Sequence, residues 1–138
     1  MKAEYAPFKV QEVVDLLGRF HTHLGPYLII GARMAEIAIE RLGFDPFKMK
    51  AIVYTGITPP LSCMVDGIQF ISGCTLGKGN IKIEDSGIPE AKFIKDDKTI
   101  LFRLLKHPDL KGLVTEQVRQ VALEYAKMPA EDFLEILE

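Results

Sequence analysis

Apolar residues recur every three or four positions in several stretches of the chain, a spacing typical of amphipathic helices. This spacing predicts helices over residues 9–20, 25–42, 61–72 and 114–127, and a last short helix that starts at Pro129 and carries Phe133, Leu134 and Leu137. Pro26 suits a first helical turn, and Gly43 is a natural helix end. Because the helix over 25–42 is apolar around most of its surface, we expect it to be the buried central helix.

Shorter runs of β-branched and aromatic residues predict strands. These runs cover residues 51–55, 81–84, 91–95 and 99–104. Asp96 and Asp97 favour a hairpin turn, so the last two strands should pair antiparallel. The order of helices, strands and helices, with a single parallel crossover, indicates an α+β fold whose helices cover one face of a small, mainly antiparallel sheet.

Composition narrows the class of protein. The chain has 138 residues, of which 48% are hydrophobic, and no linker or repeat divides it, so we expect a single domain over residues 1–138. Its 17 basic and 19 acidic residues are interspersed, which argues against a nucleic-acid partner. The N-terminal residues lack the uninterrupted apolar run of a signal peptide, and Arg33 and Glu36 break the most apolar segment, so we expect a cytoplasmic protein without a membrane partner.

Most metal-binding side chains lie in two places. His21 and His23 precede the helix over 25–42, and in a turn both can face one point. In the alternative interpretation, His23 satisfies backbone donors at the helix start and His21 is solvated.

The second place holds two cysteines and an acidic residue. Cys63 and Asp66 share one helical face, and Cys74 follows the Gly73 break. Imidazole, thiolate and carboxylate together suit a divalent transition metal, zinc first, with water in any open position. The absence of a CxxC pair excludes a zinc ribbon, and the alternative for Cys63 is simple packing in the core.

Three further residues are candidates for binding an anion. Thr75 and Lys78 lie in a glycine-rich segment that lacks the spacing of a P-loop, so a plain link from helix to strand is the more economical account. Arg33, inside an apolar helix, must either extend to solvent or pair within a site or interface.

With these residues in view, the chain resembles the FmdE family, which is named for one of the subunits of molybdenum or tungsten formylmethanofuran dehydrogenase. The resemblance covers nearly the whole chain and rests on the motifs FHTHLGP at 20–26 with GARM at 31–34, CMVDGIQ at 63–69, and GCTLGKGNI at 73–81. It implies the same α+β core, an intertwined homodimer, and possible partners among the subunits of a molybdenum or tungsten dehydrogenase.

The chain also departs from that family. The family's first motif usually reads like His-Gly-His-x-Cys-Pro-Gly, so Thr22, Gly25 and Tyr27 differ, and no cysteine stands at position 25. Many relatives carry a C-terminal cysteine-rich zinc domain, which this sequence does not contain.

Three hypotheses follow. The first is a homodimeric metal-binding protein that holds zinc through His23 and Cys74, with His21, Cys63 or Asp66 completing the shell. It would act as an accessory protein or as a metal-dependent enzyme of unknown substrate, with no catalytic residue identified. The second is a metal-free module that binds an anion between the histidine turn and the glycine-rich link, using Lys78 and Arg33. The third is a structural dimeric subunit.

Overall fold

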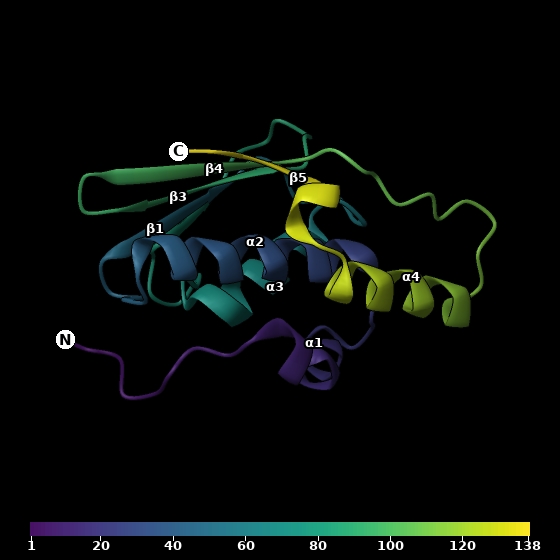
Figure 1. Cartoon of the computed structure of the whole chain (residues 1–138), viewed down its shortest axis with the longest axis horizontal. Coiled ribbons are helices and arrows are strands. Elements are labelled where there is room, and N and C mark those ends of the chain that lie inside the picture. Colours follow the sequence, from purple (N-terminus) through teal and green to yellow (C-terminus); the bar gives the residue numbers. More distant parts are fainter.

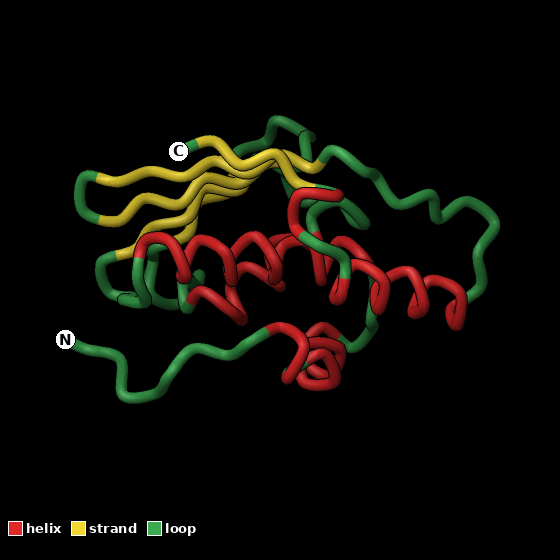
Figure 2. The backbone as a smooth tube through the Cα atoms, in the orientation of Figure 1, coloured by secondary structure: helices red, strands yellow, loops and turns green.

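A five-stranded sheet covered on one side by helices forms the frame of the molecule (Figures 1 and 2). The computed structural model describes residues 1–138. The elements in chain order are η1 (Val10–Glu12), α1 (Val14–His21), α2 (Pro26–Leu42), β1 (Met49–Val53), α3 (Cys63–Ser72), β2 (Ile81–Ile83), β3 (Glu90–Lys95), β4 (Lys98–Leu104), α4 (Thr115–Lys127), η2 (Ala130–Asp132) and β5 (Leu134–Leu137). The predicted α+β class is confirmed.

The sheet has the order β2-β1-β3-β4-β5, in which only the β1–β2 pair is parallel. Helix α3 makes the crossover between these two strands. The predicted β3–β4 hairpin is present, and Asp96 takes the left-handed conformation (φ 55°) in its turn. Phe93 and Phe102 pack edge to face on the buried side, with ring centroids 5.7 Å apart. Alternate residues of each strand therefore fix the sheet to the helices.

Two predicted helices take a different form. The first is interrupted, because a 3₁₀ turn over Val10–Glu12 precedes α1, and the Val10 amide donates to Glu36 at 2.6 Å. The helix predicted from Pro129 is wrong beyond its first turn, because the chain continues as β5 and pairs with β4. Pairing satisfies the backbone groups on the open edge of β4, and helical periodicity gives no sign of it.

Helix α2 is the buried centre of the fold, as predicted. It crosses α3 at two glycines that leave no room for a side chain. A Cβ atom on Gly31 would overlap the Met64 carbonyl, and a Cβ atom on Gly67 would overlap the Leu28 carbonyl. The two backbones are therefore in direct contact, which places the first turn of α3 beside the start of α2. Although α2 is strongly apolar, no helix of the protein is long and apolar enough to cross a membrane.

Substituting either crossing glycine should destabilise the protein. In an ordinary helix, Gly→Ala is worth up to about 1 kcal/mol of added stability. At Gly31 or Gly67 the new methyl group must force the helices apart, so we expect a loss of at least about 2 kcal/mol in the free energy of unfolding. Urea denaturation measures the loss.

Gly77→Ala is the matched control, because a Cβ atom there meets nothing within 4 Å. Wild-type stability in Gly31→Ala and Gly67→Ala would contradict the close crossing.

Candidate functional site

His21 and Asp66 form a half-buried pair where the end of α1 meets the first turn of α3. His21 Nδ1 lies 2.5 Å from Asp66 Oδ2, and the two side chains are 15% and 37% exposed. An ionised carboxylate only accepts hydrogen bonds, so Nδ1 is the donor here, and in the neutral imidazole Nε2 then keeps a free lone pair. The same arrangement orients metal-ligating histidines in proteins.

A left-handed residue turns the chain at this point. Thr22 has φ 67° and ends α1, and its hydroxyl donates to the His21 carbonyl at 2.6 Å. Leu24 is buried and anchors the turn before α2 begins at Pro26. The turn thus brings His21 and His23 to the start of the central helix.

His21, His23 and Cys63 line the same small cavity. The start of α2 forms one wall, and Leu110 and Val118, from far along the chain, form another. Its volume is about 30 Å³, which holds an ion or a water molecule but no organic substrate. Asp66 stands outside the cavity and reaches it only through His21.

Cys63 is the first residue of α3 and is half-buried. Burial, and then the nearby Asp66 carboxylate, raise the pKa of the Cys63 thiol. The neutral thiol is therefore the dominant form at neutral pH, and a cation in the cavity would favour the thiolate.

The imidazole of His23 occupies space that a side chain at position 25 would need. Its ring centroid is 6.1 Å from that of His21, with 52° between the ring planes. A Cβ atom on Gly25 would lie 2.9 Å from His23 Cε1. A larger residue at position 25 would therefore require the His23 ring to move.

The metal site expected from the sequence is not assembled in a single chain. No group of three or more His, Cys, Asp and Glu side chains is arranged to hold a metal ion. Of the predicted ligands, His21, His23 and Cys63 share one cavity.

Cys74 lies at the opposite end of α3, contrary to the expectation that it shares a site with His23. The ten-residue helix separates it from Cys63 by about 15 Å. Its thiol is fully buried and lies 3.5 Å from the Met49 carbonyl oxygen, and burial raises its pKa. Cys74 is therefore part of the core.

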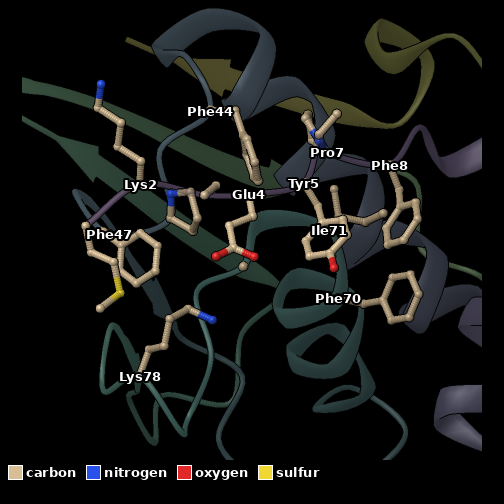
Figure 3. Close-up of a pocket in the computed structure, with 15 residues that line it drawn as sticks. Lys2, Glu4, Tyr5, Pro7, Phe8, Phe44, Phe47, Phe70, Ile71 and Lys78 are labelled. Carbon is tan, nitrogen blue, oxygen red and sulfur yellow. The ribbon is translucent and has the colours of Figure 1, made fainter.

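Thr75 and Lys78 lie at this same far end. Lys78 Nζ donates to Thr75 Oγ1 at 3.0 Å, so the glycine-rich link closes on itself. Lys78 also extends into an apolar pocket of about 390 Å³ beneath the N-terminal segment, where Phe44 and Phe70 form part of the wall (Figure 3). Since α3 separates the link from the histidine turn, the expected anion cleft between them is not formed.

Arg33 makes structural contacts. It donates to the carbonyl oxygens of Tyr125 and Met128 at 2.7 and 2.8 Å, where α4 ends. Its guanidinium also lies 3.5 Å from Glu36 and over the Phe133 ring. Burial lowers the pKa of Arg33, and nearby acids oppose that shift. Arg33 therefore holds the end of α4 and does not reach the cavity.

The chain is a small α+β domain in which a histidine–carboxylate pair lies near a cysteine. Residues 20–135 match the family described as "FmdE, Molybdenum formylmethanofuran dehydrogenase operon". The chain belongs to the FmdE family.

A solved structure shares this fold. A tungsten formylmethanofuran dehydrogenase FmdE-like protein from Syntrophus aciditrophicus superposes with a TM-score of 0.67, at 19% identity, over 99% of this chain and 75% of that one. At this identity the likeness shows the fold alone.

A curated relative matches in part. A "Probable S-adenosyl-L-methionine-binding protein" from Archaeoglobus fulgidus is 36% identical over 70 residues, which are 49% of this chain and 19% of that protein. The chain therefore spans a small part of that relative's length.

The two thiols should differ in their reaction with iodoacetamide. Cys63 is partly accessible and Cys74 is not, so Cys63 should be alkylated first in the native protein. Because the pKa of Cys63 is raised, its rate should still be climbing as the pH rises above about 8.5, the region of an ordinary thiol. Peptide mass spectrometry of the alkylated protein locates the label, and equal native labelling of Cys74 would contradict its burial.

Proposed function

We propose that this protein binds one divalent transition metal ion, zinc first, in the cavity at the histidine turn. The protein ligands are His21 through Nε2, Cys63 through its sulfur, and His23. Asp66 orients His21 from outside the cavity. The observation that carries the proposal is the 2.5 Å contact of His21 with Asp66, which orients a histidine that lines an ion-sized space together with Cys63.

The distance between the two histidine rings is close to the distance that binding of one ion requires. With zinc–nitrogen distances of about 2.0–2.1 Å, two imidazoles on a tetrahedral ion have ring centroids about 5 Å apart. The rings here are 6.1 Å apart, so binding one ion would require them to approach by about 1 Å. Gly25 supports this proposal, because the space beside the ring carries no side chain.

The chemical types of these ligands also suit zinc. Imidazole and thiolate are its usual ligands, and three protein ligands leave one position for water. A bound metal there would supply Lewis-acid chemistry or an activated water. Cys63 would bind as the thiolate, so its proton leaves when the metal enters.

As its wider role, we propose that the protein acts as an accessory protein related to the FmdE component of formylmethanofuran dehydrogenase. The family description supports it, and so does the fold shared with the FmdE-like protein of Syntrophus aciditrophicus. A metal-dependent enzyme of unknown substrate stays the alternative. Association as a homodimer, and with subunits of a molybdenum or tungsten dehydrogenase, also stay predictions.

Metal content per chain tests the site. Protein purified without an affinity tag and reconstituted with zinc should hold about one ion per chain by elemental analysis. His21→Ala and Cys63→Ser should lose most of it, because each removes a direct ligand. Asp66→Asn should keep the ligands but bind zinc about 10-fold to 100-fold more weakly, because it loses the orienting carboxylate.

Cys74→Ala is the matched control, because it removes the other thiol at the far end of α3. It should keep its metal. Loss of zinc in Cys74→Ala with retention in Cys63→Ser would contradict the proposed site, as would wild-type protein that takes up no zinc.

A further inference from the structure

A second, polar hollow adjoins the histidine turn on its outer side. Its wall combines residues of α1, the turn and α4, among them Asp15, Arg19, His23 and Arg119. The volume is about 340 Å³, within the range of small-molecule sites and roughly ten times that of the metal cavity. His23 lines both spaces.

The charges around this hollow favour an anion. Two guanidinium groups line it, against one carboxylate. That carboxylate, Asp15, is paired with Arg19 Nε at 2.8 Å on an exposed helix face, which leaves the terminal nitrogens of Arg19 free to donate. Arg119 forms no ion pair or side-chain hydrogen bond. Paired arginine donors are well suited to bind the oxygens of a carboxylate or phosphate.

We propose that this hollow binds a small molecule that carries a carboxylate or phosphate group, held between Arg19 and Arg119. The remainder of the ligand extends to His23 and, through it, to the proposed metal. The link to the metal rests on the proposed function; the anion site itself does not. This assignment moves anion binding from Lys78 and Arg33, which the structure engages elsewhere, to two arginines on facing helices.

The first experiment uses the full chain freed of metal by a chelator. Inorganic phosphate and acetate are titrated separately at low salt and followed by NMR chemical shifts. The wild-type protein should bind at least one of the two, with shifts centred on residues 15–23 and on Arg119. Arg119→Gln and Arg19→Gln should each weaken binding about tenfold or more, and about 0.5 M sodium chloride should weaken it further.

Arg41→Gln is the control, because it removes an equal charge from a distant surface pair with Glu138. It should bind as the wild type does. Equal binding by Arg119→Gln and the wild type, or no binding of either anion by the wild type, would overturn the proposal. The relative affinities for phosphate and acetate identify which group the site prefers.

The second experiment repeats the titration on cobalt-loaded protein and records the visible spectrum of the cobalt. Spectral changes that saturate with anion binding, and that Arg119→Gln weakens, would support the link to the metal. Anion binding without a spectral change would overturn that link. Failure to load cobalt counts against the proposed function alone, because the metal-free titration tests the anion site by itself.

Discussion

The close crossing of α2 and α3 is the constraint on which the candidate site depends. Gly31 and Gly67 let each helix backbone rest on a carbonyl of the other. Met64, which Gly31 meets, adjoins Cys63, and Gly67 adjoins Asp66. The contact that packs the core therefore also sets where the Cys63 thiol and the Asp66 carboxylate lie relative to the histidine turn. An ion-sized space lies at the starts of these two helices.

Asp66 influences both His21 and Cys63 beside the cavity. Its carboxylate accepts a hydrogen bond from Nδ1 of His21, which leaves Nε2 of the neutral ring as an acceptor, and its charge adds to the effect of burial in raising the pKa of Cys63. The acceptor on His21 and the negative charge of Asp66 favour a cation in the cavity, and a cation would relieve the repulsion between the Cys63 thiolate and the carboxylate. On the other side of His23, arginines replace the carboxylate as the dominant charges. The histidine turn thus separates a space suited to a cation from one suited to an anion.

The sequence predicts those elements whose signal is local. The periodicity of α2 and α3 and the acidic turn of the β3–β4 hairpin are each contained in one short segment, and each was correctly predicted. The strand β5 was missed because its conformation comes from pairing with β4. The His21–Asp66 pair joins residues 45 positions apart, so only the helix crossing reveals it. The distance between Cys74 and Cys63 could have been anticipated, because a helix predicted over 61–72 already places its two ends far apart.

X-ray absorption spectroscopy of the zinc-loaded protein tests the central claim most directly, because it counts sulfur and histidine neighbours of the metal. The account predicts one sulfur at about 2.3 Å from zinc, together with scattering from two imidazole rings. A shell of nitrogen and oxygen alone would contradict it, since Cys63 would then not be a ligand. Two sulfurs per zinc would contradict it equally, because α3 holds Cys63 and Cys74 at opposite ends.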